Sequence, residues 1–278
     1  MQNNVENALK IAFVGGGNMA NALLGGLAGK LTSGSNIHVV DPNAEALQRL
    51  HQHFGVSTAG AVDERLAQAD VIVLAVKPQQ MKEVAKALLP QIGSQLVLSI
   101  AAGIRASDLA RWLGGHGAIV RCMPNTPALI GQGITGMVAT DGVSAEQKQA
   151  AQAIMQSVGA TVWLANESLI DPVTAVSGSG PAYVFYFIEA MQQAAQEMGL
   201  SAEQGTQLAI ATFTGAAQLA AQSSEPVSVL RERVTSKGGT TYAALSSMEQ
   251  SGVKEAIVKA LHAAAARGKE LGEEFGRD

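Results

Sequence analysis

Short apolar runs alternate with amphipathic stretches through the first half of the chain. Five runs are rich in β-branched residues and bounded by Gly, Pro, Asn or Asp, as strands are: "KIAFV", "NIHVVDPN", "ADVIVLAVKP", "QLVLSIAAG" and "GAIVRCMPN". Helical patterns fill the gaps, beginning at about Asn18 and covering 43–54, 79–89 and 105–113. Strands that alternate with helices predict an α/β domain, a doubly wound parallel sheet with crossover helices.

From about residue 170 the pattern becomes nearly continuous helix. Pro181 fits the first turn of a helix that Gly199 ends, and its apolar faces predict burial. Residues 204–224 carry no charge, but their glutamines and alanines favour a protein interface over a membrane span. We place the boundary within 163–172, which predicts a sheet domain of residues 1–166 and an all-α domain of residues 167–278.

Composition narrows the possible partners. Charged residues make up only 15% of the chain and the formal net charge is −4, so nucleic acid is excluded as a partner and burial against a second subunit is favoured. The first ten residues, "MQNNVENALK", lack the basic and apolar segments of a signal peptide. We expect a cytoplasmic protein with no membrane association, and we expect its single cysteine, Cys122, to be buried and inert.

A glycine turn follows the first strand. Gly15, Gly17 and Ala20 fit the G-x-G-x-x-G/A fingerprint of a Rossmann dinucleotide-binding domain, in which the turn and the following helix bind a pyrophosphate. A glycine-rich structural turn is the alternative. The predicted cofactor-binding residues of this segment are Val14, Gly15, Gly16, Gly17, Asn18, Met19 and Ala20.

Asp41 follows the second strand, about 25 residues beyond the glycines, where an acid can bind a ribose hydroxyl. Its charge would repel a 2′-phosphate, which favours NADH. A plain helix-capping turn over Asp41–Asn43 is the competing interpretation.

The later strands end at the edge of the sheet where open α/β sheets bind ligands. We therefore expect further cofactor contacts, near the nicotinamide, from Ala75, Val76, Lys77, Pro78, Ala101, Ala102, Gly103 and Asn125. Asn125 offers both a donor and an acceptor to a carboxamide or a ribose.

A second glycine-rich segment, "VTSKGGTTYAAL", lies between helical stretches at 234–245. Gly238 and Gly239 let the backbone approach a ligand closely, and N–H groups that precede a helix bind anions. This loop predicts a site for a small anion.

The motifs "GGGNMA", "AVKP", "MPNTP", "SGSGPAY" and "VTSKGGTT", in this order over almost the whole chain, resemble the pyrroline-5-carboxylate reductase family. The resemblance implies reduction of 1-pyrroline-5-carboxylate to L-proline, and a helical dimerisation domain that interlocks with a partner's, the homodimers often forming larger homo-oligomers. It also implies that the carboxylate of the substrate, pyrroline-5-carboxylate, binds Ser236, Gly238, Gly239, Thr240 and Thr241, with Thr241 the catalytic contact. The alternative role of Thr241 is to cap a helix that begins near Tyr242.

Two positions depart from the family pattern. Lys237 stands where many members have proline, and Asp41 stands where many NADPH-dependent members have polar or basic residues. The family favours NADPH and the local charge favours NADH, so both cofactors remain candidates.

Reduction of a protonated imine needs no strong protein acid, which agrees with five histidines in no catalytic arrangement; we expect no metal. A β-hydroxyacid dehydrogenase would need a lysine within 181–198, which has none, and a ketol-acid reductoisomerase would need paired carboxylates, where this helix has only Glu189 and Glu197. A non-catalytic NAD(P)-binding oligomer that senses redox state would not need the loop at 236–241.

Overall fold

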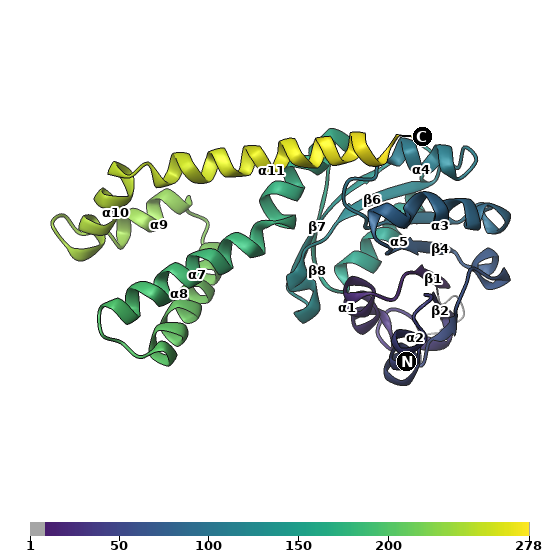
Figure 1. Ribbon diagram of the computed structural model, residues 1–278, viewed down its shortest axis with the longest axis horizontal. Helices are drawn as coiled ribbons and strands as arrows, with labels where there is room; N and C mark the ends of the chain where they lie inside the picture. Colours follow the sequence, from purple (N-terminus) through teal and green to yellow (C-terminus); the bar gives the residue numbers. More distant parts are fainter. Residues whose placement is uncertain (1–8, 278) are drawn as a thin grey trace. The chain divides into compact units, whose positions relative to one another are not determined.

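The computed structural model describes residues 9–277 (Figure 1). They form two compact units: one contains the residues up to 179 together with 264–277, and the other contains residues 180–263. The predicted boundary at residue 166 stays a prediction. The first eight residues of "MQNNVENALK" lie outside the described residues.

One sheet of eight strands forms the centre of the first unit, in the order β3-β2-β1-β4-β5-β6-β7-β8. All neighbours are parallel except β6 and β7. The strands are β1 (Ile11–Val14), β2 (Ile37–Val40), β3 (Ser57–Ala59), β4 (Val71–Leu74), β5 (Leu96–Ser99), β6 (Ile119–Met123), β7 (Gly133–Ala139) and β8 (Gly159–Trp163). The mostly parallel α/β sheet is confirmed, and β3, β7 and β8 are additional to the five predicted strands.

Helices follow most strands of this unit. The α-helices are α1 (Asn18–Leu27), α2 (Ala44–Phe54), α3 (Met81–Leu88), α4 (Ala106–Trp112), α5 (Ala145–Gln156) and α6 (Ile170–Val173). Short 3-10 helices are η1 (Gly34–Asn36), η2 (Glu64–Gln68), η3 (Pro78–Gln80), η4 (Leu89–Gln91), η5 (Thr126–Ile130) and η6 (Glu167–Leu169), and η7 (Thr174–Gly178) is a π-helix.

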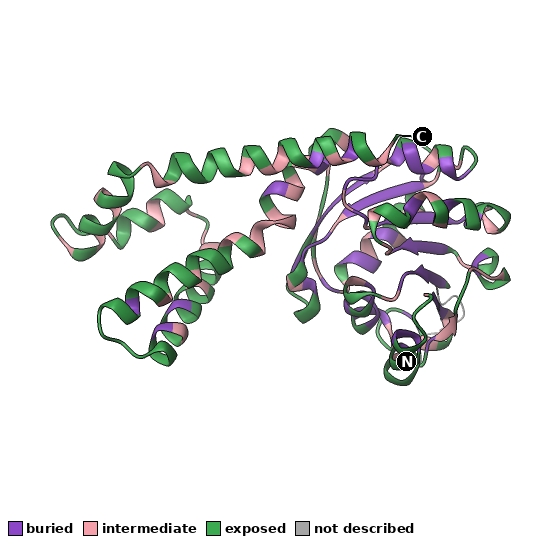
Figure 2. Cartoon of the chain, in the orientation of Figure 1, coloured by how far each residue is buried: buried purple, intermediate pink, exposed green. Residues whose placement is uncertain are grey.

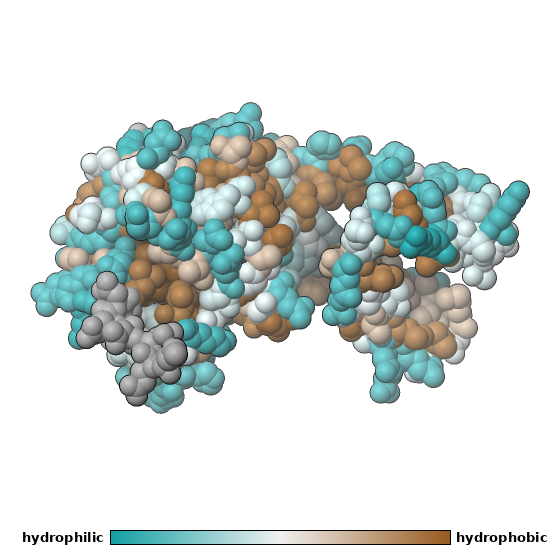
Figure 3. Space-filling model, turned by 180° about the vertical axis from the view of Figure 1, so that it is seen from behind, coloured by the Kyte–Doolittle hydropathy of each residue, from teal (hydrophilic) through white to brown (hydrophobic). Residues whose placement is uncertain are grey.

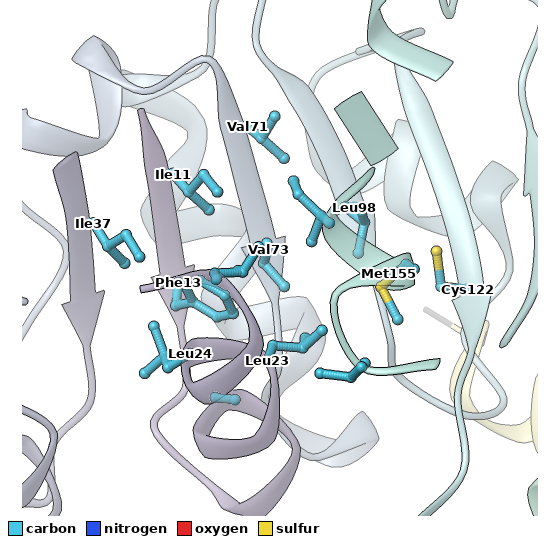
Figure 4. Packing of buried hydrophobic residues seen from close by; sticks show 14 of the residues in the cluster. Ile11, Phe13, Leu23, Leu24, Ile37, Val71, Val73, Leu98, Cys122 and Met155 are labelled. Atoms are coloured by element: carbon cyan, nitrogen blue, oxygen red, sulfur yellow. The ribbon is translucent and has the colours of Figure 1, made fainter. Parts of the chain in front are cut away.

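Both faces of the sheet are covered, because residues that alternate along each strand enter different cores. Ile11 and Phe13 pack with apolar residues of α1, α2 and α5, whereas Ala12 and Val14 pack with those of α3 and α4. Strands β1, β2, β4 and β5 are accordingly buried at every position (Figure 2). Figure 4 shows the first core, which includes Cys122. The expected burial of Cys122 is confirmed, and burial raises the pKa of its thiol, which disfavours the reactive thiolate.

The second unit is helical. Its elements are α7 (Gly180–Glu197), α8 (Ala202–Gln222), α9 (Val227–Arg233), α10 (Thr240–Gln250) and the first part of α11 (Val253–Phe275). Helices α7 and α8 lie side by side (Figure 1), and Gly205 allows close contact because a Cβ there would lie 3.0 Å from the Cβ of Ala195.

The predicted burial of α7 is wrong for the single chain. Phe185 and Tyr186 are 60% and 72% exposed, and Met198, directly after the end of α7, is 78% exposed. Helix α7 packs mainly against one neighbour, α8, and a single neighbour cannot cover an apolar helix on all faces. Apolar side chains are accordingly visible on the surface of the helical unit (Figure 3). Within residues 9–277, no helix combines the length and the apolar character needed to cross a membrane.

Candidate functional site

The turn between β1 and α1 has the geometry that its glycines predict. Gly15 has φ +105°, and a Cβ there would lie 2.6 Å from the carbonyl oxygen of Ala75. Gly17 is different, since a Cβ on it would meet no atom within 4 Å. Gly15 is therefore required by the turn itself, whereas Gly17 keeps space open above the turn.

Gly17 is also the N-cap of α1, and no side chain caps this helix. The first N–H groups of an uncapped helix are free to bind an anion, and the helix dipole favours negative charge there. Val14 and Ala20 lie buried beneath the turn, with Met19 half-buried, while Asn18 is exposed beside Gly17. The turn and the helix fit the pyrophosphate of a dinucleotide.

Asp41 contacts the glycine turn directly. Its Oδ2 accepts a hydrogen bond from Gly16 N at 2.7 Å, and its Oδ1 accepts one from Asn43 N at 2.8 Å. Helix α2 is capped instead by the side chain of Asn43, which accepts from Ala46 N. Asp41 thus joins β2, the glycine turn and the start of α2, a role that sequence reasoning did not predict in this detail.

A groove of about 880 Å³ begins at this turn and continues along α1. Gly16, Gly17 and Asn18 line it together with side chains of α2 and of η5. Among the described residues, its charged and titratable lining residues are Lys30, Arg49 and His53, and none of the described residues contributes a carboxylate to it. Arg49 was not predicted, although its spacing of three residues from buried Ala46 places it on the side of α2 that faces the groove.

The remaining predicted cofactor segments lie at the carboxyl ends of β4 and β5. Ala75 and Val76 are half-buried, and exposed Lys77 precedes η3, which begins with Pro78. Ala101 is buried, and Gly103 has φ +71°. A Cβ on Gly103 would lie 3.1 Å from Cβ of Leu271, so this glycine accommodates the end of α11 within the first unit.

Asn125 follows β6 at the same edge of the sheet. It is 9% exposed, and both polar atoms of its side chain are bonded within the unit. Oδ1 accepts from Ile134 N at 3.0 Å, and Nδ2 donates to the carbonyl of Ser177 at 3.2 Å. The side chain therefore connects η7 with the start of β7.

The second predicted anion site is the loop before α10, in the helical unit. Gly238 has φ +73°, and a Cβ on Gly239 would lie 2.6 Å from Oγ of Ser236. Gly239 is the N-cap of α10 and, as at α1, no side chain caps the helix. The helix begins at Thr240, so Thr241 lies within its first turn and does not cap it. Ser236 and Thr240 are exposed, and Thr241 is half-buried.

Two cationic residues, Arg233 and Lys237, lie next to or within this loop, and only one of them forms an ion pair in the described structure. Arg233 at the end of α9 pairs with both oxygens of Glu225, at 2.5 and 2.7 Å, which leaves it poorly placed to hold another anion. Lys237, inside the loop, is exposed.

The histidines are not near this loop in the sequence. His51 and His53 are exposed on α2, as expected, and His38 is buried in β2 against Ser57 and Asp63.

Two family models match the chain. Residues 167–271 match pyrroline-5-carboxylate reductase dimerisation, and residues 10–103 match NADP oxidoreductase coenzyme F420-dependent. The pyrroline-5-carboxylate reductase of Pseudomonas aeruginosa is 45% identical over 96% of this chain and 98% of its own.

Solved structures agree over the same length. A pyrroline-5-carboxylate reductase from Coxiella burnetii is 40% identical with a TM-score of 0.89, covering 95% of this chain and 99% of that one. The Plasmodium falciparum pyrroline carboxylate reductase with NADP bound is 32% identical with a TM-score of 0.85, covering 97% and 100%. With two glycine turns that each precede an uncapped helix, and with relatives of this identity along nearly its entire length, the chain belongs to the pyrroline-5-carboxylate reductase family.

Proposed function

We propose that this protein reduces 1-pyrroline-5-carboxylate to L-proline with NAD(P)H. The observation that carries the proposal is the pair of glycine turns that each end in a glycine N-cap with no side-chain cap, Gly17 before α1 and Gly239 before α10. Each presents free N–H groups to an anion, and the reaction brings two anions together, the cofactor's pyrophosphate and the substrate's carboxylate. A non-catalytic NAD(P)-binding protein would account for the first helix but not for the second.

The loop before α10 binds the substrate carboxylate in this proposal. The backbone N–H of Gly239 donates to the carbonyl of Ser236, so the N–H groups that face the anion are those of Gly238, Thr240 and Thr241. Ser236 and Thr240 lie at the margins of the anion, and the hydroxyl of Thr241 hydrogen-bonds the carboxylate or the ring nitrogen. Because the charge of the carboxylate does not change during reduction, these contacts position the ring rather than stabilise the transition state selectively. Lys237 adds a positive charge that favours the same anion.

The sheet-bearing unit holds the cofactor, with the pyrophosphate at Gly15–Asn18 and the nicotinamide at the carboxyl ends of β4, β5 and β6. When bound, the cofactor supplies the hydride that is added to the C=N carbon. The chain's own contribution is orientation, since a protonated imine is already electrophilic and needs no strong protein acid. The absence of a catalytic histidine arrangement among the described residues agrees with this chemistry.

The match to the dimerisation model supports a homodimer, and the exposed apolar surface of α7 is the kind that a second copy would cover. We further propose that the dimers assemble into a larger homo-oligomer in the cytoplasm, and that the sheet and helical domains divide between residues 166 and 167. Mass measured by light scattering tests the assembly.

A comparison of 1-pyrroline-5-carboxylate with 1-pyrroline, the same ring without its carboxylate, tests the proposed role of the loop. We expect kcat/KM for 1-pyrroline to be lower by about a hundredfold or more, because the ring is no longer held against the cofactor. Equal values for the two imines would contradict a carboxylate-binding loop while leaving imine reduction intact.

A further inference from the structure

Asn125 occupies a position where the pairing of two strands stops. Strands β6 and β7 pair up to Met123 opposite Gly136, and two further steps of this register would place Asn125 opposite Ile134. Pro124 intervenes, and the backbone carbonyl of Asn125 accepts instead from Ala128 N at 3.1 Å within η5. The side-chain Oδ1 of Asn125 then accepts the hydrogen bond from Ile134 N that a continued strand would have supplied.

The amide nitrogen of Asn125, Nδ2, compensates for a second proline, Pro181. In an α-helix the carbonyl of Ser177 would accept from the N–H of residue 181, but residue 181 is proline and has no N–H. The π-helix η7 lies directly before this point, with Ser179 N bonded to the carbonyl of Thr174 at 2.8 Å. Nδ2 of Asn125 donates to the Ser177 carbonyl that Pro181 leaves without its helical partner.

The π-helix η7 and the end of β6 are in close contact as well as joined by this hydrogen bond. A Cβ on Gly178 would lie 2.6 Å from Cε of Met123, so the π-helical turn packs directly on the end of β6. Single π-helical turns often occur at functional sites. Here the turn contacts the "MPNTP" segment at the carboxyl edge of the sheet, where ligands of open α/β sheets bind.

We propose that Asn125 is a positioning residue for the reduction: its amide holds η7 against the ends of β6 and β7 and thereby fixes the wall of the cofactor site formed by Met123–Thr126. This inference rests on the proposed function and departs from our expectation that Asn125 binds the nicotinamide or its ribose. A residue that positions the wall affects the rate of the bound complex, whereas a direct ligand affects the affinity for the cofactor.

Asn125→Asp is the sharpest variant. It keeps the shape and the acceptor for Ile134 N, but it loses the donor to Ser177 and places a carboxylate beside a carbonyl oxygen. We expect kcat with 1-pyrroline-5-carboxylate to fall by about tenfold to a hundredfold, while the Kd for NADPH, titrated without substrate, stays within about twofold. Asn36→Ala is the matched control. It removes an asparagine amide that is bonded to Thr32 Oγ1 at the amino end of β2, so kcat and the Kd for NADPH should both stay unchanged.

The double variant Asn125→Asp with Pro181→Ala tests the donor specifically. Residue 181 then has an N–H that can satisfy the Ser177 carbonyl, so we expect part of the lost kcat to return. A Kd for NADPH that weakens in proportion to the loss of kcat would overturn the proposal in favour of a direct cofactor ligand. A kcat that Asn125→Asp leaves unchanged, or that the double variant does not raise, would also overturn it.

Amide hydrogen exchange provides a measurement independent of turnover. Exchange over residues 174–180 should be faster in Asn125→Asp than in the wild type, and it should slow again in the double variant, with no change in Asn36→Ala. If the wild type did not reduce pyrroline-5-carboxylate, the proposed function would be wrong. The exchange rates of the wild type and the variants would still show whether the Asn125 amide holds η7 in place. Unchanged exchange in Asn125→Asp would overturn the inference whether or not the enzyme turns over.

Discussion

The carboxylate of Asp41 is bonded to the backbone of Gly16, with Oδ2 2.7 Å from the amide nitrogen of the glycine turn. The two residues lie 25 positions apart, and the bond connects the end of β2 to the cofactor turn. Asp41 therefore shapes the turn as well as adding negative charge near the position expected for the adenosine ribose.

Replacing Asp41 by Asn removes the charge and leaves one acceptor oxygen, which can bond Gly16 N while the bond from Asn43 N is lost. We expect the ratio of kcat/KM for NADPH to that for NADH to rise by about tenfold, because the repulsion of a 2′-phosphate is relieved. Steady-state kinetics with both cofactors measure this ratio. Asp141→Asn removes an equally negative but exposed side chain elsewhere in the unit, and a similar shift in that control would mean that net charge alone is responsible.

Substitution by alanine at two glycines of one turn should affect two different properties, thermal stability at Gly15 and cofactor binding at Gly17. Gly15→Ala places a Cβ 2.6 Å from the Ala75 carbonyl at φ +105°, so we expect a large loss of thermal stability. Gly17→Ala meets no protein atom, so the melting temperature should stay near that of the wild type while NADPH binding weakens. Thermal unfolding and cofactor titration separate the two; equal melting temperatures for both variants would refute the assigned roles.

Thr241→Ala should lower kcat/KM for pyrroline-5-carboxylate by about tenfold or more, since a hydrogen bond to a charged group is lost at the proposed substrate loop. The Kd for NADPH should not change. Thr212→Ala serves as the control, because its hydroxyl bonds only the carbonyl of Leu208 within α8. Normal turnover by Thr241→Ala would remove this residue from the site.

An ion pair between a buried arginine and a half-buried glutamate stabilises the segment between the sheet and η7. Arg121 of β6 has 4% of its side chain exposed, and its Nη1 lies 2.8 Å from Oε1 of Glu167, which also accepts from Ala106 N at the start of α4. Glu167→Ala should lower the free energy of unfolding by about 3 kcal/mol, because a buried guanidinium loses its partner. In denaturant titrations the exposed pair Arg267–Glu270 offers a contrast, because Glu270→Ala should lower the free energy of unfolding far less.

Asp171 gives a prediction with a defined sign. Burial raises the pKa of its carboxyl above the ordinary value, an effect that nearby Arg121 and Arg105 only partly oppose. The folded state therefore binds the proton more tightly than the unfolded state, so the ionised carboxylate lowers stability once the pH exceeds the unfolded pKa. Asp171→Asn should raise the melting temperature at pH 7 and have little effect below the unfolded pKa. A destabilised variant at pH 7 would show that the ionised form makes favourable contacts.

The strands that the sequence predicts are those buried on both faces, such as Ile11–Val14 and Val71–Leu74, which read as apolar runs. The strands that it did not predict lack that signal. β3 has three residues and is only half-buried, glycines interrupt β7, and β8 is the partly exposed edge strand. Their pairing is decided by neighbours distant in the sequence.

In the candidate site, too, the local features could be predicted from the sequence and the contacts between distant segments could not. Glycine spacing marked both candidate anion-binding turns, because a turn and the helix after it are local features of the chain. The bonds of Asp41 to Gly16 and of Asn125 to Ser177 join segments 25 and 52 residues apart, so no local pattern reveals them. The exposure of α7 was missed for a related reason, since its apolar pattern does not say whether the covering surface belongs to the same chain.

The most direct test of the account is the loss of nicotinamide absorbance when the purified protein meets 1-pyrroline-5-carboxylate, measured in parallel with NADPH and with NADH. We predict oxidation of at least one cofactor with formation of an equal amount of proline. Cofactor that binds but is not oxidised, in the presence of substrate, would contradict the proposed reductase and favour a non-catalytic NAD(P)-binding protein.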